Sequence, residues 1–306
     1  MGRATFTIKP KGPFSLEEAA NFGFGQREAA WDGVMRLAFC VDSYRQQVGV
    51  EIRQDGGGVH CAMVGDADVP AVERQVARVL SLDYDGDAFL EVGKRDPVIG
   101  RLQAAAPGLR PPLFYSPYEA AAWGVLSARR PHAQMAEVRQ MLSEVHGATF
   151  DVAGEKLAAL PVPAQMLEIE SFPGIPPIKI GRLHDVAKAA LEGRLDVDRI
   201  KPMEPDAAMA DLQSIKGIGP FYSALIVVRA SGLADVLPEH EPKVLDAAMR
   251  LYGLPHPPAP EQFLAMAEPW RPFRTWAVVL MRAAVNRVLA SQAVNARRAA
   301  FSRSSR

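Results

Sequence analysis

Apolar and polar residues alternate with a period of two through the first eighty positions, and a period near 3.6 dominates afterwards. Such alternation indicates half-buried strands, and a helical spacing of apolar residues predicts one helix over 69–80. Residues 55–58, Asp-Gly-Gly-Gly, are typical of a hairpin turn between the last two strands. We therefore predict a small α+β domain over 1–96, with strands at 5–8, 34–41, 47–53 and 59–64.

After Pro97 the pattern changes to amphipathic helices separated by loops that are rich in proline and glycine. We predict helices over 101–106, 118–127, 134–144, 163–169, 179–191, 206–215, 221–229, 242–251, 260–267 and 274–289. The expected fold class is α+β: a small β-rich N-terminal domain, 1–96, followed by an all-helical region, 97–306.

The composition is that of a globular protein, with 306 residues, 48% of them hydrophobic, and equal numbers of basic and acidic residues. It excludes a disordered chain, and no apolar run approaches the roughly 18 residues of a membrane span. The chain does not open with a secretory leader pattern. Cys40 and Cys61 lie in strand-like runs and are expected to be buried free thiols. We expect a cytoplasmic protein without membrane contact.

Charge is unevenly distributed along this neutral chain. Residues 271–306 contain eight arginines and no acid, which leaves 27 bases and 35 acids in the first 270 residues. A basic segment of this kind indicates a polyanionic partner such as DNA. The alternative is a solvated arginine tail with no partner.

The most informative segment is 212–225, where one helix ends at Gly217-Ile218-Gly219 and another starts immediately afterwards. Glycines without Cβ atoms permit the tight turn and a close approach to another surface. The free amides and the dipole at the start of the second helix favour an anion, and a DNA phosphate fits. The alternative is a structural helix-turn-helix corner in which glycine caps the first helix.

This segment resembles the hairpin of the helix-hairpin-helix (HhH-GPD) superfamily of DNA glycosylases, and in particular of members that remove 3-methyladenine. Other segments of the chain resemble the same family in the same order; they are 99–110, 118–119, 189–193 and 268–277. The resemblance covers roughly residues 5–290.

The resemblance implies two helical subdomains with a base-binding cleft between them, and the hairpin would span 206–229. It also implies that the backbone carbonyls of Gln213, Ile215 and Gly217 hold a monovalent cation, Na+ or K+, and that no other cofactor is required. The partner would be double-stranded DNA with damaged bases. We expect a monomer associated with the nucleoid.

Base excision requires that the damaged nucleotide leave the stack and enter a pocket with aromatic walls. An alkylated purine is cationic, so electron-rich rings attract it further. Each candidate could equally belong to the core; the candidates are Tyr115, Phe221, Tyr222, Trp270 and Trp276. DNA contacts are expected from the hairpin and from Arg129, Arg271 and Arg274.

A carboxylate is needed to stabilise the oxocarbenium-like sugar and to activate water. The family places an Asp about 20 residues after the first aromatic residue of the second hairpin helix, and this chain has none there. Gapless counting from Phe221 puts Glu241 at that place, whereas a one-residue deletion would put His240 there. Alternatively, Glu239-His240-Glu241 is only an acidic helix N-terminus.

Two further departures concern the DNA contact and the reaction type. Where the family carries a wedge residue that fills the gap left by the flipped base, this chain has Arg129-Arg130. We expect these arginines either to fill the gap and bind phosphate together or to form a solvated corner. No lysine stands where bifunctional members keep a Schiff-base lysine, and no cysteine pattern indicates an iron–sulfur cluster. The sequence favours a monofunctional glycosylase for alkylated purines, and the rival hypothesis is a non-catalytic DNA-binding or damage-sensing protein.

Overall fold

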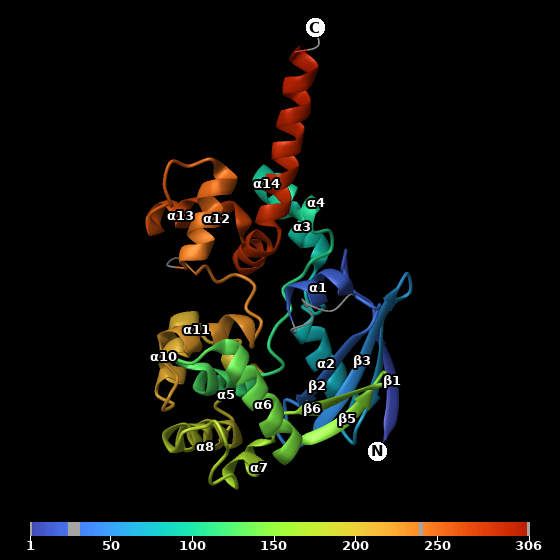
Figure 1. Cartoon of the computed structure of the whole chain (residues 1–306), viewed down its shortest axis with the longest axis vertical. Coiled ribbons are helices and arrows are strands. Elements are labelled where there is room, and N and C mark those ends of the chain that lie inside the picture. Colours follow the sequence, from blue (N-terminus) through green and yellow to red (C-terminus); the bar gives the residue numbers. More distant parts are fainter. Residues whose placement is uncertain (1, 24–30, 239–240, 305–306) are drawn as a thin grey trace. The chain divides into compact units, whose positions relative to one another are not determined.

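A computed structural model describes residues 2–23, 31–238 and 241–304. The α+β fold class is confirmed, with a four-stranded antiparallel sheet near the N-terminus and many helices after it (Figure 1). Among the described residues, no helix combines the length and the apolar character needed to cross a bilayer.

The chain forms two compact units, and each unit is assembled from three segments. Unit 1 comprises 1–9, 28–83 and 112–233, and unit 2 comprises 10–27, 84–111 and 234–306. This grouping differs from the expected boundary after residue 96. The difference arises because Cys40 and Tyr44, from the sheet region, are buried in the same core as the helices after Tyr118.

The sheet of unit 1 has the order β1-β4-β3-β2, with all neighbours antiparallel. Alternating burial along β4 shows why the period-two pattern predicted it. The helix α2 begins at the cap Asp68 and packs near β1. The strands and this helix are β1 (Arg3–Ile8), β2 (Met35–Cys40), β3 (Gln47–Asp55), β4 (Gly58–Val64) and α2 (Val69–Val79).

A second hairpin, which the sequence pattern did not predict, is formed by β5 (Ala148–Val152) and β6 (Glu155–Ala159). It packs on β2 and β3, as Figure 1 also shows. The approach is close, because a β-carbon on Gly49 would lie 2.6 Å from a methyl group of Val152. Each strand has only five residues, too few for a period-two pattern to be recognised between the predicted helices.

The remaining elements of unit 1 are helices, and the predicted ones agree with the structure to within three residues at each end. They are α5 (Pro117–Ser127), α6 (His132–His146), α7 (Pro163–Leu167), α8 (Pro177–Leu191), α9 (Val197–Ile200), α10 (Pro205–Gln213) and α11 (Pro220–Arg229). Proline in the first turn marks most of these starts, because it lacks the amide that a helix N-terminus leaves unpaired.

Unit 2 is helical and has its own core around Phe263, Trp270 and Met281. Its helices are α1 (Leu16–Phe22), α3 (Gly86–Arg95), α4 (Pro97–Ala105), α12 (Pro242–Tyr252), α13 (Pro260–Ala267), the 3-10 turn η2 (Glu268–Trp270) and α14 (Arg274–Ser304). Helices α1 and α3 were not predicted from the sequence. The last helix was predicted to end at residue 289, whereas α14 continues to Ser304.

Candidate nucleic-acid interface and catalytic region

The predicted glycine turn joins α10 to α11 in unit 1. Gly217 has φ +98°, a left-handed backbone that glycine adopts without strain, and Gly219 is the N-cap of α11. No side chain caps this helix start. Within the described part of the chain, the amides of Lys216, Gly217 and Gly219 donate no hydrogen bond. Several unpaired amides at the positive end of a helix form an anion-binding site.

Ile218 plays a different part in the turn from its two glycine neighbours. Its side chain is buried, and its amide donates to the carbonyl of Ile215 over 3.0 Å. Ile218 therefore anchors the turn to the core of unit 1, while the backbone of the glycines stays accessible. A β-carbon on Gly219 would meet no atom within 4 Å.

The surroundings of the turn are basic. A hollow beside Gly217 is lined by Arg182, Lys188 and Lys216, with Asp185 as its one acidic residue. Phe221 is 69% exposed at the first turn of α11, and its ring meets that of Tyr222 edge-on at 5.2 Å. An exposed aromatic ring beside free amides and cations is suited to contact with nucleic acid.

The carbonyls that the resemblance assigns to a cation also lie in this turn. The carbonyl of Ile215 accepts the amide of Ile218, whereas those of Gln213 and Gly217 accept no hydrogen bond from any described residue. Unpaired carbonyls at the end of a helix need a donor or a cation. The backbone geometry is therefore compatible with a monovalent ion.

Glu241, the residue that gapless counting puts at the catalytic position, is the N-cap of α12 in unit 2. Its Oε2 accepts the amide of Val244 over 3.1 Å, and its side chain is partly exposed. The capping contact agrees with the alternative reading of a structural helix start. It also holds the carboxylate in one orientation. Glu239 and His240 lie outside the described residues, and the choice between the two registers stays a prediction.

Arg271 and Arg274, two of the expected DNA contacts, are paired within unit 2. Asp235 accepts from Nη1 of Arg271 at 2.8 Å, and from Nε and Nη2 of Arg274 at 2.8 and 3.0 Å. Glu268 also accepts from Arg271. Because carboxylates already match these guanidinium groups, their first role is to hold the loop at Asp235 against the start of α14. A DNA contact by either stays a prediction.

The five expected pocket aromatics are divided between the two units. Tyr115, Phe221 and Tyr222 lie in unit 1, and Trp270 and Trp276 lie in unit 2. Tyr222 packs against Gly124 and its hydroxyl meets Oγ of Ser127 at 2.8 Å. Tyr115 stacks at a tilt on Phe39.

Trp270 is fully buried, and its indole N–H donates to Asp96 over 2.7 Å. The same oxygen of Asp96 accepts the Tyr252 hydroxyl. Because it has no accessible face and its polar atom is satisfied, Trp270 belongs to the core of unit 2 and does not line a pocket. The sequence alone could not separate these roles, since a tryptophan in the Trp-Arg element fits both.

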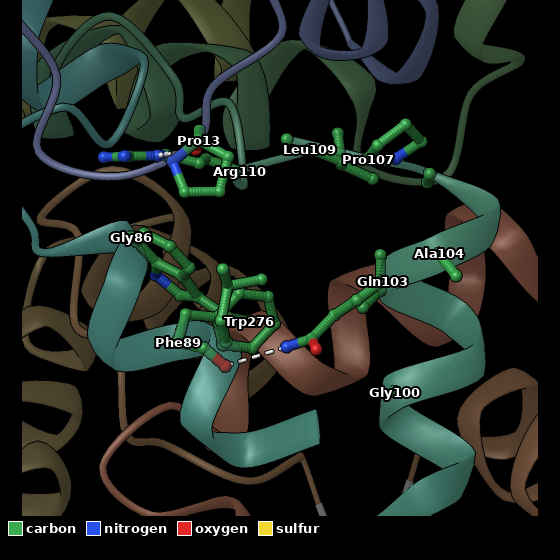
Figure 2. A pocket seen from close by; sticks show the side chains of 14 residues that line it. Pro13, Gly86, Phe89, Gly100, Gln103, Ala104, Pro107, Leu109, Arg110 and Trp276 are labelled. Carbon is green, nitrogen blue, oxygen red and sulfur yellow. Dashed lines mark hydrogen bonds between the residues drawn. The ribbon is translucent and has the colours of Figure 1, made fainter. Parts of the chain in front are cut away.

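Trp276 lines a mainly apolar cavity of about 320 Å³ in unit 2, together with Phe89 and Leu280. Figure 2 shows Trp276 and Phe89 on one side of this cavity, with Pro13 and Arg110 across from them. The Arg110 guanidinium lies 5.9 Å from the centre of the Trp276 ring, and it donates to the carbonyls of Pro13 and Tyr84. A cation already occupies the neighbourhood of this ring.

No protein-family model matches the chain. It is 22% identical over 204 residues to the DNA-3-methyladenine glycosylase of Bacillus subtilis, a match that covers 64% of this chain and 66% of that one. It is 27% identical over 185 residues to DNA-3-methyladenine glycosylase 2 of Escherichia coli, covering 59% and 62%. The matched stretches are thus under two thirds of each relative.

A 3-methyladenine DNA glycosylase from Archaeoglobus fulgidus superposes with a TM-score of 0.70 at 20% identity, covering 92% of this chain and 97% of that one. The 8-oxoguanine glycosylase/lyase of Clostridium acetobutylicum gives 0.62 at 16% identity, covering 91% and 99%. The chain has the fold of the HhH-GPD glycosylases. The resemblance inferred from the hairpin and its companion segments is confirmed in fold over nearly the whole chain, and in sequence over 64% and 59% of it for the two relatives.

In this glycosylase fold the structure also reveals basic residues that the sequence analysis did not select. Lys179 and Arg182 lie in the first turns of α8, close to the C-terminal end of α5 and to the hairpin. Their spacing of three residues places them on one face of a helix that begins with two prolines. That spacing, with no acid in the first turn of α8, was the available signal.

Both cysteines are free and buried, as expected. Burial raises the pKa of the Cys61 thiol to about 12 and that of Cys40 well above its usual range. Neither thiol is suited to nucleophilic chemistry. Among the described residues, no group of three histidine, cysteine, aspartate or glutamate side chains could hold a metal ion.

Proposed function

We propose that this protein is a monofunctional DNA glycosylase of base excision repair that removes alkylated purines, such as 3-methyladenine, from double-stranded DNA. The observation that carries the proposal is the uncapped glycine turn at 214–219, with its free amides and basic surroundings, on a glycosylase fold. The names of the two curated relatives supply the substrate class.

The turn anchors DNA through one backbone phosphate, whose oxygens accept from the amides of Gly217 and Gly219. A phosphate contact fixes the position of the duplex and carries no sequence information. Such an anchor suits an enzyme that must search all sequences for rare damage. A monovalent cation on the carbonyls of Gln213, Ile215 and Gly217 would add positive charge to the same turn.

The reaction adds water at C1′ of the sugar and breaks the bond between C1′ and the base nitrogen, whose electron pair leaves with the base. An alkylated purine carries a positive charge and leaves as a neutral molecule, so it needs little further activation. Glu241 would accept the proton from water and stabilise the positive charge that develops on the sugar. Its capping contact with Val244 holds one oxygen, and no described residue donates to the other.

The capping role of Glu241 also favours the second candidate, a non-catalytic DNA-binding or damage-sensing protein on the same fold. A glutamate retained only to begin α12 would not carry out chemistry. In that protein the turn would still bind phosphate, and the damaged base would be held and not released.

The deciding experiment incubates the purified protein with duplex DNA that contains a single 3-methyladenine, and measures both binding and the formation of abasic sites. Binding followed by base release, with no strand cleavage, supports the monofunctional glycosylase. Persistent binding without release supports the second candidate. Absence of any DNA binding contradicts both.

A further inference from the structure

A second hollow in unit 1 has a lining that contains four basic side chains and no acid. The basic residues are Arg129 and Arg130, which follow α5, and Lys179 and Arg182 from α8. Arg182 also lines the hollow beside Gly217. The two hollows therefore meet at Arg182, and positive charge continues from the glycine turn to the end of α5.

Lys179 is unusual for a charged residue because it is buried, with only 8% of its surface exposed. The ammonium donates to the carbonyls of Leu126 and Ala128, at the C-terminal end of α5. An ammonium has three N–H donors, so one remains after these two contacts. Burial, together with Arg130 and Arg182, lowers the pKa of Lys179. The lining contains four cations and no carboxylate, so the site holds more positive charge than its own groups balance.

The helix α8 adds to this imbalance. Lys179 and Arg182 lie in its first two turns, where the helix dipole is positive and acids are favoured. The first turn has no acid, and no side chain caps it. Cations at this end of a helix are unfavourable unless an anion is bound near them.

The arginines of the hollow, Arg129, Arg130 and Arg182, form no ion pair with any described carboxylate. Arg129 is exposed and has φ +56°, a conformation that costs a non-glycine residue about 1 kcal/mol or more. Some other surface arginines in this chain pair with carboxylates, as Arg199 does with Asp211 and Arg53 does with Glu51.

We propose that the hollow of Arg129, Arg130, Lys179 and Arg182 binds a second phosphodiester of the DNA backbone, next to the phosphate at the glycine turn. The proposal rests on the proposed function, because DNA is the ligand. Guanidinium groups bind phosphate oxygens in a bidentate manner, and the fixed ammonium of Lys179 supplies a point charge behind them. In this proposal Arg129 and Arg130 contact the DNA backbone; they neither act as a gap-filling wedge nor form a solvated corner.

The test measures the affinity for an undamaged duplex by fluorescence anisotropy over a series of salt concentrations. The double variant Arg129→Gln/Arg130→Gln removes two charges from the hollow. The matched control, Arg45→Gln/Arg74→Gln, removes two exposed charges of the same unit that do not line it. Each phosphate contact contributes about 0.9 to the slope of log affinity against log salt. We expect the hollow variant to lose about 0.9 from this slope relative to the control.

Failure of this inference can be separated from failure of the proposed function. If the wild type binds DNA and Gly219→Ser weakens it, but the hollow variant has the slope of the control, the second phosphate site is wrong and the function stands. If the wild type binds no DNA, the proposed function itself fails. Thermal unfolding of both double variants verifies that they are folded.

Discussion

Gly217 and Arg182 lie so close together that a β-carbon on Gly217 would be 3.0 Å from Cδ of Arg182. The left-handed φ of +98° adds strain for any side chain. We therefore expect Gly217→Ala to lower the free energy of unfolding by about 1–2 kcal/mol. Chemical denaturation measures this loss, and an unchanged stability would mean that the turn relaxes easily.

Gly219 offers the matched substitution, because its β-carbon would enter open space and its φ of −95° suits any residue. Serine is a good N-cap, so Gly219→Ser should keep or slightly raise the stability while its hydroxyl competes for the amides of α11. If these amides bind phosphate, DNA affinity should fall roughly tenfold, the loss of one charged hydrogen bond. A stable variant with unchanged affinity would show that the glycine turn is not the DNA anchor.

Glu241→Gln keeps the size and most of the capping geometry of the side chain but removes its charge. If the carboxylate stabilises the sugar cation, the rate of base release should fall by about a hundredfold or more, with DNA affinity nearly unchanged. Single-turnover assays on a 3-methyladenine duplex measure the rate.

The companion variant Glu241→Asp retains the charge and is a better N-cap. It should preserve release if charge is what matters. A protein in which both variants release base as fast as the wild type has its catalytic group elsewhere, and His240→Ala then tests the other register.

Asp235 joins the guanidinium groups of Arg271 and Arg274, and only about a quarter of its side chain is exposed. Asp235→Asn should lower the free energy of unfolding by about 1–2 kcal/mol. Most of this loss should come from the pair with Arg274, because Arg271 is half exposed and solvent screens its charge. Glu268→Gln is the control, since this exposed carboxylate contacts Arg271 alone. Its loss should stay below about 0.5 kcal/mol. If the freed arginines contact DNA, Asp235→Asn should also bind DNA more tightly than the wild type.

Glu119 is buried, and its Oε2 accepts from Arg139 over 2.6 Å while Oε1 accepts the amide of Cys40. Burial raises the pKa of Glu119, and Arg139 opposes that shift. Arg139→Gln should raise the pKa further. When the pKa of a carboxyl is higher in the folded state than in the unfolded state, the protein loses stability as the pH rises above the unfolded-state pKa. The reason is that the folded state must then hold an unpaired buried charge.

The cost of Arg139→Gln should therefore be small near pH 4.5 and reach about 2–3 kcal/mol near pH 8. Urea unfolding at the two pH values measures it. Glu137→Gln, on the exposed side of the same helix, should show no such dependence. An equal loss at both pH values would mean that Arg139 contributes by packing and not by charge.

Local signals in the sequence determined most of the elements. Period-two alternation located the strands of the main sheet, and apolar residues at helical spacing between loops rich in proline and glycine located most of the helices. Both patterns depend only on neighbours along the chain. The glycine turn was predicted for the same reason. The strand pair β5–β6 and the helix α1 were missed, since segments of five to seven residues carry too few periods to be distinguished from their surroundings.

Only the tertiary structure decided which segments share a core and which charges remain without partners. Trp270 and Trp276 belong to the same sequence element, yet Trp270 donates a hydrogen bond to Asp96 in the core and Trp276 lines a cavity. Arg274 and Arg129 are both arginines near helix ends, but Asp235 neutralises the first, and no described acidic side chain pairs with the second. These partners are separated by tens of residues along the chain, and burial and pairing depend on distances that only the folded chain defines.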